Sequence, residues 1–215
     1  MSCDPTGSRV VLSREDVGER VLALTFDDGP SAWTPLLLDL RAGHGARATF
    51  FVLGEAVAGR EDVLRRAVGD GHELGNHTFS HAHPGYLEDD ALREELERTG
   101  ALVERVSGVR PQLVRPPYGE DPDRVARIAG GLGLGPTVLW SVDPKDWSEP
   151  PAGAIAGHVV RAARPGAIVD LHDGLGSAPE ERTRRPTVDA LAEALPALAE
   201  RGYRCVTLSE LLAAE

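Results

Sequence analysis

The chain has 215 residues, a formal net charge of −11 and a hydrophobic fraction of 41%. This length suits one domain with a full hydrophobic core, which we expect to span residues 1–215. The negative charge argues against nucleic-acid and anionic-membrane partners, because both bind clustered Lys and Arg side chains. We interpret the tight basic cluster of Arg182, Arg184 and Arg185 as a solvated loop.

The sequence shows no clear targeting signal and no cysteine motif. No apolar run approaches the roughly 20 residues that cross a bilayer. Residues 1–11 lack the basic start and apolar block of a signal peptide. We therefore expect a cytoplasmic protein as the chain is given, or an extracellular or cell-wall protein if a leader has been removed. Cys3 and Cys205 lack the C-x-x-C spacing of a zinc or redox site, and a disulfide between them stays open.

Apolar runs with strand composition alternate with amphipathic segments along the chain. The predicted strands are 21–26, 48–52, 73–76, 113–115, 137–142, 167–171 and 203–207. The predicted helices are 34–41, 61–68, 89–106, 122–129, 152–163 and 188–200. Thr34 is the expected N-cap of the first helix, and Pro196 is expected to kink or restart the last one. This alternation predicts an α/β fold on a parallel sheet.

Polar residues follow five of the predicted strands. They are Asp27-Asp28, His77, Arg115, the segment 143–147 and His172-Asp173. Carboxyl ends of parallel strands meet at one edge, where α/β folds bind their ligands. Five such ends that carry reactive side chains indicate a closed or nearly closed barrel with the site at its mouth.

The first two polar motifs predict a metal site. In T-F-D-D-G-P, one of the adjacent carboxylates of Asp27 and Asp28 could bind a metal while the other contacts a metal-bound water. In H-T-F-S-H, one helical turn would place His77 and His81 on the same side. Each motif alone is weak. Together, Asp28 and the two histidines give three ligands with open positions, as in catalytic zinc sites.

The later motifs supply other groups. In R-P-P-Y-G, two prolines fix the backbone, so the N–H of Tyr118 could bind a developing oxyanion. The segment D-P-K-D-W at 143–147 offers two acids and an aromatic wall of the kind on which sugars stack. His172 and Asp173 end an otherwise apolar strand.

Read together and in this order, the five motifs resemble the polysaccharide deacetylases of carbohydrate esterase family 4, the nodulation-protein-B-like domain. The resemblance covers a core at 21–174. It implies a distorted, parallel, seven-stranded (β/α) barrel. It also implies a metal-dependent hydrolase that removes acetyl groups, N-acetyl foremost, from a carbohydrate by attack of metal-bound water.

The resemblance assigns roles to the matched residues. Asp28, His77 and His81 would hold a divalent ion, with Zn²⁺ first and Co²⁺ or another divalent ion as alternatives. The expected catalytic group is Asp27 as base, His172 as acid, Arg115 to position the base, Asp146 to pair with the histidine, and the Tyr118 N–H.

The expected substrate contacts are Trp147, Pro116 and Asp170. Asp170 departs from the family, which typically has Leu two residues before the catalytic histidine, where it helps hold the acetyl methyl. Side chains alternate along a strand, so Asp170 should face the site with His172 and contact a polar or cationic part of the substrate, or pair with a nearby base. Alternatively, a bend turns Asp170 outward, or Leu171 or Leu175 fills the methyl pocket.

Two other functions stay open. A metal-dependent amidase of a small N-acylated metabolite is favoured by Asp170, by the lack of a visible leader and by the lack of long insertions that would build a polymer groove. A catalytically dead carbohydrate-binding relative is disfavoured because no ligand or base is missing. The sequence predicts neither the particular glycan nor the oligomeric state.

Overall fold

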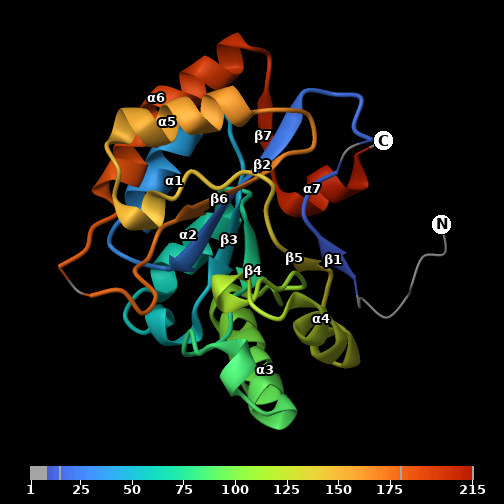
Figure 1. Cartoon of the computed structure of the whole chain (residues 1–215). Coiled ribbons are helices and arrows are strands. Elements are labelled where there is room, and N and C mark those ends of the chain that lie inside the picture. Colours follow the sequence, from blue (N-terminus) through green and yellow to red (C-terminus); the bar gives the residue numbers. More distant parts are fainter. Residues whose placement is uncertain (1–8, 15, 180, 215) are drawn as a thin grey trace.

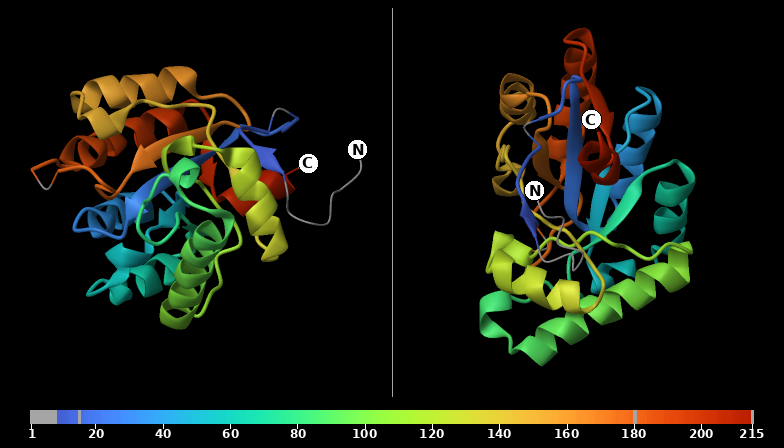
Figure 2. Two further views of the ribbon diagram at one scale, coloured as in Figure 1. Left: turned by 60° about the horizontal axis from the view of Figure 1, so that its bottom comes forward. Right: turned by 90° about the vertical axis from the view of Figure 1, so that its right-hand side faces the viewer.

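The computed structural model describes residues 9–14, 16–179 and 181–214, and within them parallel strands form the centre of the molecule with helices around them (Figures 1 and 2). The strands are β1 (Val10–Val11), β2 (Val21–Gly29), β3 (Thr49–Val52), β4 (Glu73–Asn76), β5 (Thr137–Val138), β6 (Ile168–His172) and β7 (Arg204–Val206). The α-helices are α1 (Thr34–Ala42), α2 (Glu61–Gly69), α3 (Asp89–Ser107), α4 (Pro122–Gly131), α5 (Ala152–Ala162), α6 (Arg185–Glu200) and α7 (Leu208–Ala213). Short 3₁₀ turns are η1 (Gly54–Val57), η2 (Pro84–Tyr86), η3 (Pro117–Gly119) and η4 (Asp146–Ser148).

The strands close into a distorted barrel. β2 pairs in parallel with β3 and β6 and, at its start, with β7, and β3 pairs with β4. Single bridges then carry the pairing from Asn76 to Val114, from Val114 to Thr137, and from Val142 back to Val169 of β6. β1 pairs in parallel with β5. The parallel, distorted barrel predicted from the sequence is therefore present.

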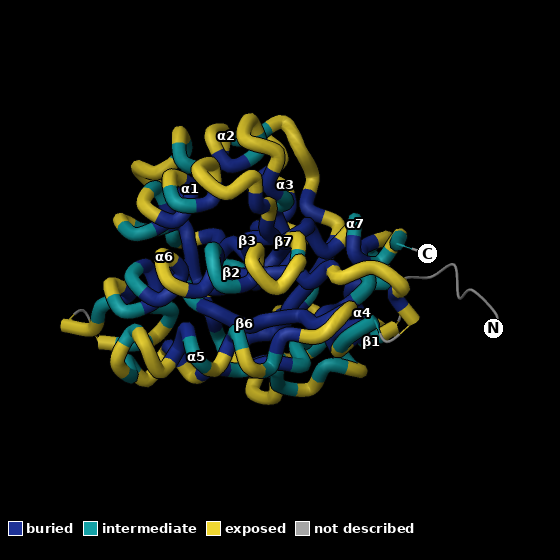
Figure 3. Tube along the Cα trace, turned by 90° about the horizontal axis from the view of Figure 1, so that it is seen from above, coloured by how far each residue is buried: buried dark blue, intermediate teal, exposed yellow. Residues whose placement is uncertain are grey.

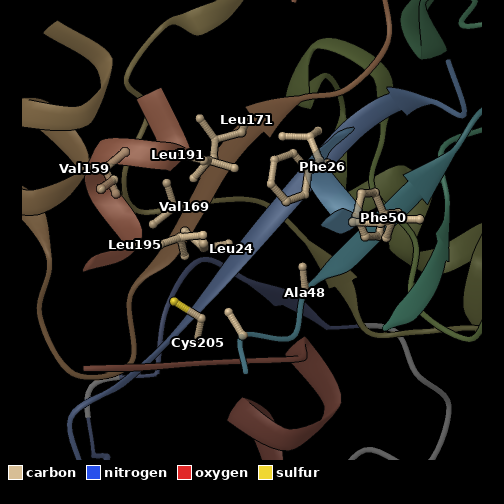
Figure 4. Packing of buried hydrophobic residues seen from close by; sticks show 14 of the residues in the cluster. Leu24, Phe26, Ala48, Phe50, Val159, Val169, Leu171, Leu191, Leu195 and Cys205 are labelled. Atoms are coloured by element: carbon tan, nitrogen blue, oxygen red, sulfur yellow. The ribbon is translucent and has the colours of Figure 1, made fainter. Parts of the chain in front are cut away.

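Alternation along β2 separates two cores. Leu22, Leu24 and Phe26 pack between the strands and the helices, where Phe26 stacks on Phe50 at 5.0 Å between ring centroids (Figure 4). Val21 and Ala23 belong to a second cluster, inside the barrel. The same alternation puts Thr25 and Asp27 on the inner face. Figure 3 shows that the central strands are mostly buried, whereas many of the outer loops are exposed.

Several predicted elements differ from the structure. The strand expected at 113–115 is reduced to the bridge at Val114, because the prolines that follow have no N–H for a ladder. Only the start and Val142 of the run at 137–142 pair. β1 and α7 were not predicted, although Thr207 starts α7 with a capping box. Thr34 is not an N-cap: Trp33 holds that position. α6 continues through Pro196 without a restart.

The structure bears in part on two further predictions, which concern membrane-spanning segments and the pairing of the cysteines. Within the described residues, no helix is long and apolar enough to cross a membrane. Cys205 is buried, and burial raises the pKa of its thiol to about 11. Cys3 lies outside the described residues, and with it the pairing to Cys205.

Candidate active site

A cavity of about 600 Å³ opens where β2, β4 and β6 end. The expected residues that line it are Asp27, Asp28, His77, His81, Tyr118, Trp147, Asp170 and His172. Arg115 and Asp146 lie directly behind this lining, hydrogen-bonded to Asp27 and His172. Pro116 is buried in its turn and does not line the cavity. The strand ends thus bring together residues that are far apart in the sequence.

A bulge at the end of β2 aims both acidic side chains at this cavity. Consecutive strand residues normally point to opposite faces. Here the pairing with β3 shifts register between Asp27 and Gly29, and Asp28 has a left-handed φ of 75°. Such a bulge re-aims a side chain, so Asp28 lines the pocket beside Asp27. The two carboxylates belong to the strand itself, which runs through Gly29, rather than to a turn after it.

His77 and His81 meet without the helical turn that the spacing predicted. The residues after β4 are irregular, and Thr78 and His81 have φ values of 69° and 58°. Glu95 of α3 accepts the Phe79 and the Ser80 N–H, each at 2.8 Å, in place of helical hydrogen bonds. The two imidazole centroids are still 5.2 Å apart. The helical turn was wrong, while the two rings do face one site.

Asp28, His77 and His81 form a buried group with the composition of a metal site. One donor atom from each lies within 4.8 Å of the others, and Asp28 Oδ1 is 3.5 Å from His77 Nε2 and 3.2 Å from His81 Nε2. His77 Nδ1 lies 2.8 Å from the Arg115 carbonyl, which can only accept, so Nδ1 carries the proton and Nε2 of the neutral ring presents a lone pair. Such a hydrogen bond on the far nitrogen is typical of metal-binding histidines.

The buried polar atoms in this group fit a cation. Within the described part of the chain, Asp28 Oδ1 is buried and has no hydrogen-bond partner. Burial raises the pKa of Asp28, but positive charge on the facing His77 and His81 rings outweighs it and holds that pKa well below its usual range. When those rings are neutral, a cation between them supplies the same positive charge. A buried anion that faces imidazole lone pairs is costly unless a positive charge lies between them. These three residues could therefore hold a divalent metal ion.

Arg115 holds the other carboxylate of the pair. Its guanidinium is fully buried, and Nη1 donates to Asp27 Oδ1 at 2.8 Å, Asp170 Oδ1 at 3.0 Å and Thr25 Oγ1 at 2.7 Å. The remaining nitrogens donate to two backbone carbonyls. One cation thus serves two carboxylates. Burial and the nearby Asp27 raise the pKa of Asp170 well above its usual range, although Arg115 opposes this.

His172 is held by a fully bonded carboxylate. Its Nδ1 lies 2.8 Å from Asp146 Oδ1, and Asp146 Oδ2 accepts the His172 N–H at 2.8 Å and the Thr187 hydroxyl at 2.7 Å. Burial alone would lower the pKa of His172, but Asp146 outweighs it and raises that pKa well above its usual range. With Nδ1 engaged, Nε2 is free to give up a proton to a bound molecule. This is the arrangement of a general acid.

Asp170 faces inward as alternation predicted. It lines the cavity on the same face of β6 as His172, whereas Leu171 packs in the outer core. The outward bend and the filling of the methyl pocket by Leu171 are therefore wrong, while Leu175 does line the cavity. The polar partner of Asp170 is Arg115, which donates a hydrogen bond to it.

The rim is aromatic. Tyr118 and Trp147 are each 49% exposed and line the cavity. The Tyr118 ring stacks on His83 at 3.8 Å between centroids, and its hydroxyl lies 3.1 Å from His81 Nδ1. The Ser177 hydroxyl lies at the same distance from that nitrogen. Through these contacts, Tyr118 and Ser177 at the rim are in direct contact with His81 of the candidate metal site.

Some site residues were missed from the sequence. Arg184 is buried, lines the cavity and donates to the Gly174 carbonyl at 2.6 Å, so the solvated loop was wrong for it, whereas Arg182 and Arg185 are exposed. Nothing in the run of basic residues distinguishes it. Thr25 could have been found, because it lies two residues before Asp27 on the same strand face.

Comparison with known proteins adds to this geometry. The family model described as polysaccharide deacetylase matches residues 14–136. A peptidoglycan-N-acetylglucosamine deacetylase of Bacillus cereus is 41% identical over 197 residues, which cover 90% of this chain and 89% of that protein. A chitooligosaccharide deacetylase of a Bradyrhizobium species is 39% identical over 201 residues, covering 90% and 91%. The crystal structure of the Bc1960 peptidoglycan N-acetylglucosamine deacetylase matches with a TM-score of 0.86 at 33% identity, covering 96% of this chain and 94% of that one.

Proposed function

Because this chain belongs to the polysaccharide deacetylase family, we propose that it hydrolyses the N-acetyl amide of an amino sugar within a glycan, releasing a carboxylic acid and a free amine. The relatives above are named for peptidoglycan N-acetylglucosamine and for chitooligosaccharide, and we infer the same substrate class here. The observation that carries the proposal is one cavity that joins a buried Asp-His-His group to a paired carboxylate and a paired histidine.

Asp28, His77 and His81 are the proposed metal ligands. Their nitrogen and oxygen donors suit Zn²⁺, with Co²⁺ or another divalent ion as alternatives. When bound, such an ion polarises a carbonyl and lowers the pKa of water from 15.7 towards about 7. The unpartnered Asp28 Oδ1, within the described residues, supports this assignment.

Asp27 is the proposed general base. Asp27 Oδ2 lies 3.7 Å from His77 Nε2, so the carboxylate borders the metal group without being needed as its third ligand. Arg115 fixes its other oxygen and so orients the carboxylate towards the attacking water. Accepting a proton from that water at the moment of attack makes it a better nucleophile.

His172 is the proposed general acid. An amine cannot leave as an amide anion, so the nitrogen of the breaking C–N bond must take a proton. Asp146 holds His172 in one orientation and in the charged state, ready to give that proton from Nε2. We further propose that the Tyr118 N–H binds the carbonyl oxygen as charge develops on it, and that Trp147 contacts the sugar ring.

Acid release from a substrate panel tests this function. The panel contains N-acetylated chitin oligomers, peptidoglycan, acetylxylan and monomeric N-acetylglucosamine, each offered to the metal-loaded protein with Asp27→Asn as matched control. We expect release from the glucosamine polymers by the wild type and about 10²–10⁴-fold slower release by the control. Turnover of the monomer alone would favour a small-metabolite amidase. Binding without any release would favour an inactive carbohydrate-binding relative.

A further inference from the structure

The floor of the cavity lies between the proposed base and the proposed acid. In the register of β2 with β6, Asp27 pairs with His172 and Thr25 pairs with Asp170. Asp170 is on the same face as His172 but two residues earlier, and therefore one step deeper in the barrel. It is 3% exposed, and this exposure is to the cavity that it lines. Asp170 thus forms the floor.

The acyl tail of a substrate must reach this floor. In an N-acyl amino sugar the end of the acyl group is the part farthest from the ring. Trp147 and Tyr118, each half-exposed at the rim, leave room for the ring at the mouth. With the amide between Asp27 and His172, the acyl tail points into the barrel. The atoms that it meets there are those of Asp170.

One oxygen of this floor is without a partner. Asp170 Oδ1 accepts from Arg115 at 3.0 Å, which is the hydrogen bond that the described residues make to this carboxyl group, and Oδ2 receives none from them. Oxygens or nitrogens of Asp27, Asp170 and His172 lie within 4.8 Å of one another, so a small group bound there touches all three. A methyl group would leave the carboxylate oxygen desolvated and unbonded, which is costly. A hydroxyl would donate to it.

We propose that Asp170 determines acyl specificity, and that the protein prefers N-acyl groups with a hydroxyl on the carbon next to the carbonyl, such as N-glycolyl, over N-acetyl. This inference rests on the proposed function and names its acyl class. The reaction is otherwise unchanged: water adds to the acyl carbon, the C–N bond breaks, the amine takes the proton, and glycolate leaves in place of acetate. A hydroxyl fits better than an ammonium, because the Arg115 guanidinium and the protonated His172 already lie beside the floor.

Paired substrates test the proposal. The same chitooligosaccharide is prepared with N-acetyl or with N-glycolyl groups, and the appearance of free amine gives kcat/KM for both. We expect the wild type to favour N-glycolyl by about 5–100-fold, the range for leaving a buried polar group without its hydrogen bond. Asp170→Leu should reverse the preference by raising kcat/KM on the N-acetyl substrate, and that gain also shows that the variant folds.

Two further variants sharpen the test. Asp170→Asn keeps a polar floor and should keep the preference for N-glycolyl. Asp143→Asn makes a matching exchange at another carboxylate of the cavity lining and should leave the ratio of the two substrates unchanged. An equal or N-acetyl preference that Asp170→Leu does not alter would overturn the inference while leaving the proposed function intact. A second bound metal ion that Asp170→Leu removes would also overturn it, because the Asp27, Asp170 and His172 group would then be a metal site.

Discussion

The two halves of the cavity differ in how completely the chain satisfies its own polar groups. In the acid half, both oxygens of Asp146 accept hydrogen bonds, and His172 is held through its ring and its backbone. In the metal half, Asp28 Oδ1 is buried without a partner among the described residues, and His77 Nε2 presents a lone pair towards it. The folded chain satisfies the polar groups of the acid half by itself, whereas we expect a bound cation to satisfy those of the metal half.

Because only the metal half is expected to need a cation, variants in the two halves should differ in whether they still bind metal. A change in the metal half should remove the ion and every function that depends on it. A change in the acid half should leave the ion bound and slow one step of the reaction. Measuring bound metal beside turnover therefore tells the halves apart.

The largest effect is expected in the metal half. His77→Ala removes one of the three proposed ligands, so bound metal and turnover should disappear together, with a loss in kcat beyond the roughly 10⁴-fold that a missing base can explain. Elemental analysis and amine release on the same sample measure both. His158→Ala is the matched control, because His158 is an exposed residue of α5 outside the ligand group. A His77→Ala protein that keeps its metal would show that the ligands are assigned wrongly.

Asp27→Asn should separate the adjacent carboxylates. It removes the base but no ligand, so kcat should fall by about 10²–10⁴-fold with metal content unchanged. Asp28→Asn should instead behave like His77→Ala. If Asp27→Asn stripped the metal while Asp28→Asn kept it, the two roles would be exchanged.

The acid half should respond to the leaving group. His172→Ala is expected to retain metal and to lose about 10²–10⁴-fold in amide hydrolysis. The loss should shrink on an aryl acetate, because a phenolate leaves without being protonated. Asp146→Asn should show the same pattern with a smaller loss. Equal losses on amide and aryl ester would contradict a role as general acid.

The rim contact to His81 should tune metal affinity. Tyr118→Phe removes the hydroxyl next to His81 Nδ1 and keeps the backbone N–H, so metal affinity should fall by about 10–100-fold while kcat at saturating metal holds. Ser177→Ala should lower metal affinity by a similar factor, since both hydroxyls lie 3.1 Å from His81 Nδ1. A fall in kcat with unchanged affinity would place the hydroxyl in the reaction instead.

Metal should also stabilise the fold. A free ion at 100 times its Kd adds about 2.7 kcal/mol to the free energy of unfolding. For a chain of this size that is a rise in Tm of about 5–10 °C. Thermal unfolding with and without Zn²⁺ should show the rise for the wild type and for His172→Ala but not for His77→Ala. A rise in all three would indicate binding elsewhere.

The barrel and most of the residues that meet in the cavity could be predicted from the sequence, because both depend on where the strands end. Alternation along one strand was enough to place Asp170 beside His172. The bulge at Asp28 could not be predicted, since it depends on pairing with β3 rather than on local residue preference. The helical turn at His77 was wrong for a similar reason: Glu95, from a distant helix, binds the backbone that a helix would have satisfied itself.

Metal titration tests the central claim most directly. The protein is stripped with a chelator, its metal content is measured, and Zn²⁺ is added back in steps while amine release from an N-acylated chitooligosaccharide is followed. Turnover should be absent without metal and should rise to a plateau at one ion per chain, with no rise in His77→Ala. Undiminished turnover by protein shown to be metal-free would contradict the account.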